Sequence, residues 1–171
     1  MIHTARLLLR GLAEDDLDEL VALDADPEVM FFVTGGVPEF QPADLPVLIA
    51  GGHWAAVERA GDRFVGWFHL RPSSPGDLEL GYRLRREFWG RGYATEGSLA
   101  LIDHAFTLLG ADRVVAETLV AHTASRRVME KAGMVESRRF RADWPYRIPG
   151  DEAGDVQYAI TREQWERRPA R

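Results

Sequence analysis

A glycine-bearing stretch, LRREFWGRGYATEG (residues 84–97), lies directly before a run that has the apolar pattern of a helix. A turn from a strand into a helix exposes several backbone N–H groups, and the helix N-terminus adds partial positive charge. Gly90 and Gly92 let a ligand approach the backbone closely, and Arg86 and Arg91 are suited to contact anionic groups. The stretch therefore predicts a site for a phosphate-bearing ligand, with a tight loop carrying solvated arginines as the alternative.

Several other kinds of site are excluded by the residue types. The stretch has neither the Gly-Lys-Ser/Thr ending of a phosphate-binding loop nor the G-x-G-x-x-G pattern of a dinucleotide fold. The chain has no cysteine, which excludes disulfides, thiolate metal sites and a cysteine nucleophile. Because His3, His53, His69 and His104 lack the spacing of metal ligands, no metal is expected.

The elements that position this stretch alternate between strands and helices. Strand-like runs cover residues 4–12, 53–60, 63–71, 77–84, 113–120, 134–141 and 156–161, and residues 77–84 alternate apolar with other side chains. Helical patterns cover residues 13–23, 93–109 and 123–132. Prolines and two Gly-Gly pairs break residues 26–52, where we expect loops and at most one short helix. The order predicts a mixed α/β fold in which antiparallel strands lead into a strand–helix–strand crossover with a parallel pair.

Size and charge narrow the classes of protein. A chain of 171 residues, 46% hydrophobic, suits one buried core, so residues 1–171 are expected to form a single domain. The net charge of -6 argues against nucleic acid as the main partner. The apolar run near the N-terminus is too short for a signal sequence or a membrane span, so we expect a cytoplasmic protein without a membrane partner.

Two motifs occur in order along the chain: ELGYRLRREFWGRGYATEG and, about thirty residues later, AHTASRRVMEKAGM. Together they resemble the GNAT superfamily of acetyl-CoA-dependent N-acetyltransferases, in particular the branch of ribosomal-protein alanine N-acetyltransferases. The resemblance extends to TARLLLRGL, DPEVMFFVTGG, GWFHL and VQYAITREQW. It implies a single N-acetyltransferase domain with a GNAT-like mixed, mostly antiparallel sheet flanked by helices, and a splayed parallel strand pair at the acetyl-CoA site.

The resemblance also implies which residues contact acetyl-CoA. The family's pyrophosphate motif, Gln/Arg-x-x-Gly-x-Gly/Ala, corresponds here to WGRGYA. The residues expected to wrap the pyrophosphate are Trp89, Gly90, Arg91, Gly92, Tyr93, Ala94 and Thr95. Backbone groups of Tyr82, Arg83 and Leu84 are expected to align with the pantetheine arm, with ordinary sheet pairing as the alternative. In the second motif His122 stands where the family has asparagine, and Ser125 matches; both are expected at the cofactor.

The implied reaction needs a group that accepts a proton from the amine, because a lysine-like amine has a pKa near ~10.4 and attacks only when neutral. Glu79 is the first candidate, since its strand leads to the cofactor site and this branch often has glutamate there; an arginine-paired surface residue is the alternative. Glu96 is a weaker candidate. Many relatives protonate the thiolate with a tyrosine, but Met129 occupies that place, which leaves Ser125 as a candidate or as a helix-cap hydroxyl.

The expected function is transfer of an acetyl group from acetyl-CoA to a primary amine, on a small molecule or a protein N-terminus. Direct transfer is the simplest route, because a chain without cysteine cannot form an acyl-enzyme on sulfur. A non-catalytic acyl-CoA-binding sensor or interaction module is the alternative. The protein is expected to be a monomer or a homodimer.

Overall fold

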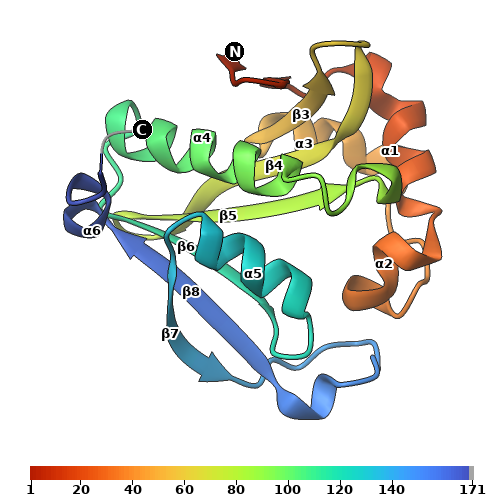
Figure 1. Cartoon of the computed structure of the whole chain (residues 1–171). Coiled ribbons are helices and arrows are strands. Elements are labelled where there is room, and N and C mark those ends of the chain that lie inside the picture. Colours follow the sequence, from red (N-terminus) through yellow and green to blue (C-terminus); the bar gives the residue numbers. More distant parts are fainter. Residues whose placement is uncertain (170–171) are drawn as a thin grey trace.

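The structure, a computed structural model, describes residues 1–169, whose strands form one 8-stranded sheet (Figure 1). The strands are β1 (Ile2–His3), β2 (Leu7–Gly11), β3 (His53–Glu58), β4 (Arg63–Ser74), β5 (Asp77–Leu84), β6 (Arg113–Leu119), β7 (Val135–Phe140) and β8 (Asp155–Thr161). The helices are α1 (Leu17–Asp24), α2 (Pro27–Thr34), α3 (Leu45–Ala50), α4 (Tyr93–Thr107), α5 (Thr123–Lys131) and α6 (Arg162–Glu166). Short 3₁₀ helices span Glu14–Asp16, Pro42–Asp44, Arg86–Phe88 and Asp151–Ala153.

The sheet has the order β1-β2-β3-β4-β5-β6-β8-β7 and is antiparallel except between β5 and β6. The parallel pair is joined by the crossover through α4, as a connection between parallel strands requires. The predicted mixed α/β fold, with a mostly antiparallel sheet and one parallel pair, is therefore confirmed. Within residues 1–169, the helices all lack the combination of length and apolar character that crossing a bilayer requires.

Two hydrophobic cores lie on opposite faces of the sheet. The larger one packs α4 and α5 on the sheet and includes Phe68 of β4 and Leu101 of α4. The smaller one is built from α1, α2 and α3 and includes Leu23 and Leu45. In Figure 1, α4 and α5 lie together in front of the strands, while α3 lies behind them. Helices therefore cover both faces of the sheet, and each face has its own hydrophobic core.

The side chains of β5 alternate between these faces. Leu80 and Leu84 belong to the core beneath α4 and α5, and Tyr82 packs against that core. Glu79 and Arg83 point to the other face, where Arg83 meets α1. A single strand thus supplies residues to both sides of the sheet, as the two-residue repeat of a strand requires.

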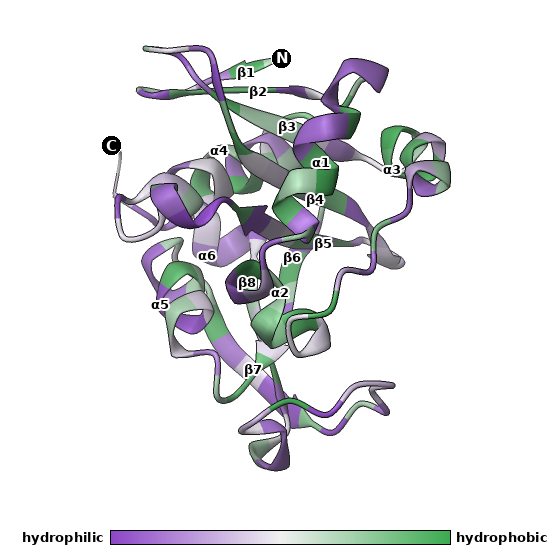
Figure 2. Cartoon of the chain, turned by 90° about the vertical axis from the view of Figure 1, so that its right-hand side faces the viewer, coloured by the Kyte–Doolittle hydropathy of each residue, from purple (hydrophilic) through white to green (hydrophobic). Residues whose placement is uncertain are grey.

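The expectation for residues 26–52 was wrong, because this segment contains both α2 and α3 and not at most one short helix. Pro27 and Pro46 lie in the first turn of these helices, where the missing N–H has no intrahelical partner to lose. Asp26 caps α2 by accepting a hydrogen bond from the backbone N–H of Glu28 at 3.0 Å. Figure 2 shows much of α2 coloured as hydrophobic, in agreement with its packing on the smaller core.

A buried ion pair joins α1 to β5. Oδ1 of Asp24 lies 2.7 Å from Nη1 of Arg83, and the two side chains are only 4% and 17% exposed. The second oxygen of Asp24 accepts hydrogen bonds from the backbone N–H groups of Glu39 and Phe40. Asp24 therefore holds both the strand and the loop that follows α2.

We expect Asp24→Ala to destabilise the fold by about 3–5 kcal/mol, because it leaves the buried Arg83 charge without a partner. Urea unfolding followed by circular dichroism measures the change. Arg167→Ala, which removes an exposed pair with Glu163 on α6, is the matched control and is expected to change the unfolding free energy little. Equal midpoints for the two variants would contradict this assignment.

Candidate functional site

The candidate site is the opening between β5 and β6. The two strands pair in parallel only where Asp77–Glu79 faces Arg113–Val115. Beyond these residues β5 continues to pair with β4, and β6 pairs with β8. Figure 1 shows the two strands diverging, with α2 and α5 on the two sides of the opening. The edge of β5 beyond Glu79 therefore faces the opening instead of a neighbouring strand.

The backbone of β5 offers polar groups to this opening. The N–H of Arg85 donates to Val65 of β4 at 2.8 Å, and successive residues of a strand direct their N–H and C=O groups to alternate sides. Tyr82 and Leu84 therefore direct their backbone groups away from β4, and the indole of Trp89 donates to the carbonyl of Leu84 at 2.8 Å. Arg83 directs its backbone to β4, so its predicted contact with a cofactor stays a prediction.

The loop before α4 forms a cradle of free N–H donors. Gly90 and Gly92 have φ values of 69° and 83°, and Gly92 precedes the first residue of α4. Within residues 1–169, the backbone N–H groups from Gly90 to Thr95 all lack a hydrogen-bond acceptor. Such a run of donors at a helix N-terminus binds anions, phosphates in particular. The cradle contains every residue predicted to wrap a pyrophosphate except Trp89, whose backbone N–H donates to the carbonyl of Arg86 at 3.0 Å. The pyrophosphate contact itself stays a prediction.

The arginines predicted to contact anions have partners within the chain. The guanidinium of Arg86 lies 3.3 Å from Asp26 on the α2 side. Arg91 lies 3.7 Å from Glu58 and stacks over the ring of Tyr93 at 5.2 Å. Both side chains remain about half exposed, so they stay within reach of a phosphate group while their charges are partly balanced.

The cradle is fixed to the connection between β1 and β2, residues 4–6. The carboxylate of Glu96 accepts hydrogen bonds from the backbone N–H and the Nε of Arg6, each at 2.7 Å, and from the hydroxyl of Thr4 at 2.5 Å. Arg6 also donates through Nη1 to the carbonyl of Arg91 at 2.8 Å. Glu96 therefore has a structural role in shaping the cradle, which sequence reasoning did not find because its partners lie far away in the chain.

His122 lies across the opening from β5, at the residue before α5. Its ring stacks on Phe32 of α2 with centroids 4.1 Å apart and planes 13° apart. Burial lowers the pKa of His122 to about 4, so the ring is neutral at neutral pH. Its Nδ1 is buried and, within residues 1–169, has no hydrogen-bond partner. A neutral nitrogen free to bond fits the cofactor contact predicted from the sequence.

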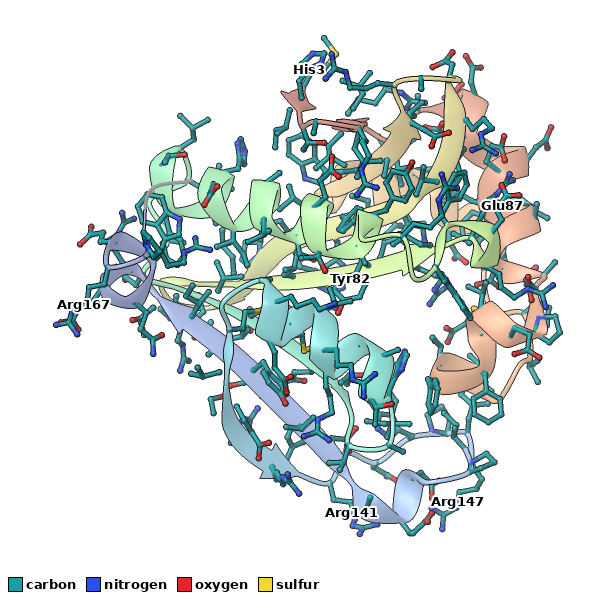
Figure 3. The ribbon with its side chains drawn as sticks, viewed as in Figure 1. His3, Tyr82, Glu87, Arg141, Arg147 and Arg167 are labelled. Atoms are coloured by element: carbon teal, nitrogen blue, oxygen red, sulfur yellow. The ribbon has the colours of Figure 1, made fainter. Side chains whose placement is uncertain are left out.

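Ser125 and Tyr82 form a hydroxyl pair that spans the opening. The Oη of Tyr82 lies 2.9 Å from the Oγ of Ser125 and donates to the carbonyl of Ser125 at 3.1 Å. Burial raises the pKa of Tyr82 to about 12, so the phenol keeps its proton. Figure 3 shows Tyr82 on β5 beside α5. Sequence reasoning gave Tyr82 a backbone role only, and no local pattern indicates this contact between residues far apart in the chain.

Glu79 lies on the other face of the sheet, near the point where the strands part. Its cross-strand partner Arg71 contacts the carboxylate at 3.2–3.3 Å, as the surface-pair alternative predicts. Nε2 of His69 lies 3.5 Å from Oε1 of Glu79. The neighbouring His69 and then Arg71 lower the pKa of Glu79, although burial acts against them. The carboxylate is therefore ionised at neutral pH, as a proton acceptor must be; its role in catalysis stays a prediction.

Comparison with known proteins agrees with this geometry. Residues 6–135 match a family model described as an acetyltransferase (GNAT) domain. The FsC-acetyl coenzyme A-N(2)-transacetylase of Aspergillus fumigatus is 36% identical, over 96% of this chain and 77% of that protein. In fold, the chain is similar to a GNAT-family acetyltransferase from Bacillus anthracis (TM-score 0.80, 24% identity, 95% and 98% of the two chains). It is also similar to the spermidine N-acetyltransferase of Vibrio cholerae in complex with CoA and spermine (TM-score 0.79, 18% identity, 94% and 98%).

We expect Gly90→Ala to weaken acetyl-CoA binding at least about tenfold, because a methyl group would enter the space in which phosphates meet the cradle. The left-handed backbone also costs the variant about 1–2 kcal/mol of stability. Gly110→Ala is a matched control, since Gly110 has a φ of 68° against 69° and both sites leave open space for a Cβ. Calorimetric titration of both variants measures the affinity, and equal binding would remove Gly90 from the cofactor site.

Proposed function

The chain belongs to the GNAT family of acetyl-CoA-dependent N-acetyltransferases, and from this premise we propose that it transfers the acetyl group directly to a primary amine. The amine belongs to a small molecule or to a protein N-terminus. The observation that carries the proposal is the cradle of free N–H groups, Gly90–Thr95, beside the unpaired edge of β5. This arrangement supports the proposal, because the cradle offers N–H donors to a pyrophosphate and the edge of β5 offers polar backbone groups to an extended arm.

Acetyl-CoA supplies an activated acyl group as a thioester. The cradle holds its pyrophosphate, and the backbone of Tyr82 and Leu84 aligns its pantetheine arm along β5. Nδ1 of His122 gives this arm a neutral hydrogen-bonding group from the α5 side. Because these groups are held by backbone geometry and ring stacking, little ordering remains for the protein when the cofactor binds.

Glu79 accepts the proton that the attacking nitrogen loses. Its carboxylate is ionised and lies on the face of the sheet covered by α1, α2 and α3, opposite the hydroxyl pair. The amine therefore approaches from the α1–α3 face, and the leaving sulfur lies toward α5. General-base assistance of this kind contributes about 10²–10⁴-fold to a rate.

Ser125 stabilises the leaving thiolate, with Tyr82 orienting its hydroxyl. Tyr82 has one hydroxyl proton, and when it donates that proton to the Oγ of Ser125, the serine proton is free for a further acceptor. Simple thiols have pKa values near ~8.5, so a hydrogen bond suffices and full protonation is not required. The hydroxyl pair should therefore contribute less to the rate than Glu79.

An acetyl-CoA consumption assay against a panel of amines tests the proposal. The panel contains N-terminal peptides, aminoglycosides and polyamines, so that it reports activity and acceptor class together. Acetyl-CoA at about 100 times its dissociation constant should stabilise the fold by about 2.7 kcal/mol. Stabilisation without turnover of any amine would favour the non-catalytic sensor, and absence of both would refute cofactor binding.

We expect Glu79→Gln to lower turnover by about 10²–10⁴-fold at neutral pH while leaving acetyl-CoA affinity unchanged. Since the pKa of Glu79 is lowered, its ionised form persists at neutral pH and is lost as the pH falls through that lowered value. Glu163→Gln on the exposed α6 is the matched control and should keep the parent's rate. A Glu79→Gln enzyme with the parent's rate and pH profile would show that another group accepts the proton.

We expect Tyr82→Phe to slow turnover about tenfold or less, because it removes the partner that orients Ser125. It should also raise the pKa of the CoA thiol in the complex, which the ultraviolet absorbance of the thiolate measures. Ser125→Ala should produce the same shift, and the double variant should add little because both act as a unit. An unchanged thiol pKa in both single variants would restrict the pair to a structural role.

A further inference from the structure

A buried histidine, His69, lies beside Glu79 and has no role in the proposed acetyl transfer. The His69 side chain on β4 is 11% exposed, and its Nε2 is buried and, within residues 1–169, without a hydrogen-bond partner. Burying an unpaired polar nitrogen costs free energy, and such groups are rare in folded proteins. That nitrogen lies 3.5 Å from Oε1 of Glu79, too far for a good hydrogen bond and close enough for a proton to bridge them after a small movement.

The surroundings of His69 hold its ring against β5. Gly81 is its register partner, and a Cβ at that position would lie 2.3 Å from Cε1 of the ring. Trp67 stacks on the ring at 5.8 Å with planes 22° apart, and His53 of β3 contacts it edge-on at 5.4 Å. Only a glycine at position 81 leaves room for the imidazole beside Glu79. The packing of β3, β4 and β5 therefore brings His69 and Glu79 together.

Glu79 alone is a weak base for the proton of the attacking amine. The ordinary pKa values of an alkylammonium and a carboxyl differ by about 6 units, or roughly 8 kcal/mol, and the attacking nitrogen becomes acidic only as it bonds to carbon. His69 and then Arg71 lower the pKa of the Glu79 carboxylate, which weakens it further as a base when it acts alone. An imidazole is ordinarily about 2 pKa units more basic than a carboxylate. A proton that arrives at Glu79 therefore has a second acceptor, Nε2 of His69, 3.5 Å away.

We propose that His69 and Glu79 form a proton-accepting pair in which Glu79 takes the proton from the amine and His69 finally holds it. This inference rests on the proposed acetyl transfer. As the carbon–nitrogen bond forms, the nitrogen–hydrogen bond breaks and its proton passes to Glu79 and then to Nε2 of His69. The carbon–sulfur bond breaks with its electrons on sulfur, and the imidazolium loses the proton to solvent before the next turnover. His69 acts through Glu79 and is a positioning residue.

The charged and titratable groups around the imidazole come from three strands. His53 lies on β3, Arg71 on β4, and Glu79 and Arg83 on β5, where Arg83 is neutralised by Asp24. Burial, with His69 as the next cause, lowers the pKa of His53 to about 4, so His53 is uncharged at neutral pH. The helix packed over β3, α3, has no charged residue in its sequence. Glu79 is therefore the anion that stabilises a protonated His69.

Nuclear magnetic resonance of the imidazole in the cofactor-free protein tests the pair directly. Glu79→Gln should lower the titration midpoint of His69 by about 1 pH unit or more, because an opposite charge within ~4–6 Å shifts a pKa by about 1–3 units. His53→Gln is the matched control, since it removes a neighbouring histidine that does not contact Glu79. In the His53→Gln background, Glu79→Gln should still lower the titration midpoint of His69. An unchanged His69 midpoint in Glu79→Gln would overturn the proposal.

Kinetics test whether the coupling serves the reaction. His69→Gln should lower turnover by about 100-fold, the lower end of the range for proton-transfer groups, and remove its titration from the pH profile while sparing acetyl-CoA affinity. Gly81→Ala keeps both groups but displaces the ring, so it should reproduce the same loss. If Glu79→Gln is slow while His69→Gln and Gly81→Ala keep the parent's rate and pH profile, the pair is refuted and the acetyl transfer stands.

Discussion

The early separation of β5 from β6 is the constraint on which the rest of the site depends. These parallel strands pair over Asp77–Glu79 and then part, which leaves the outer edge of β5 free of a neighbouring strand. The crossover through α4 places a helix N-terminus and its free amides at this edge, and α5 flanks the other side. The unpaired backbone, the anion cradle and the opening are therefore three results of one interruption in the sheet.

The alternation of side chains along β5 divides the proposed chemistry between the two faces. Tyr82 points toward α5 and meets Ser125, while Glu79 points to the opposite face and meets Arg71 and His69. A group held in the opening is thereby exposed to hydroxyls on one side and to a carboxylate on the other. In the proposed acetyl transfer, the amine lies on the Glu79 side and the leaving sulfur on the Ser125 side, and the carbon to which both bond lies in the opening between β5 and β6.

The sequence predicts local features well and the relations between distant residues poorly. Strand-like runs, the crossover and the glycine loop indicate the fold and the cradle, because each depends on neighbouring residues. The prolines in residues 26–52 misled the prediction, since Pro27 lies where a helix tolerates it and the Asp26 cap is readable in the sequence. The Tyr82–Ser125 pair joins two elements on opposite sides of the opening, and no pattern along the chain encodes that proximity.

The crossover also influences the order in which the strands that form the site come together during folding. The strands β3, β4 and β5 pair with partners close in sequence, whereas β5 and β6 are joined only after the whole of α4 has been spanned. Contacts of high sequence separation form slowly, because the entropy of closing the intervening loop is lost before the contacts compensate for it. A chain in which β3, β4 and β5 are paired but β6 is undocked has no opening between β5 and β6, so cofactor binding stabilises the completed fold relative to such intermediates.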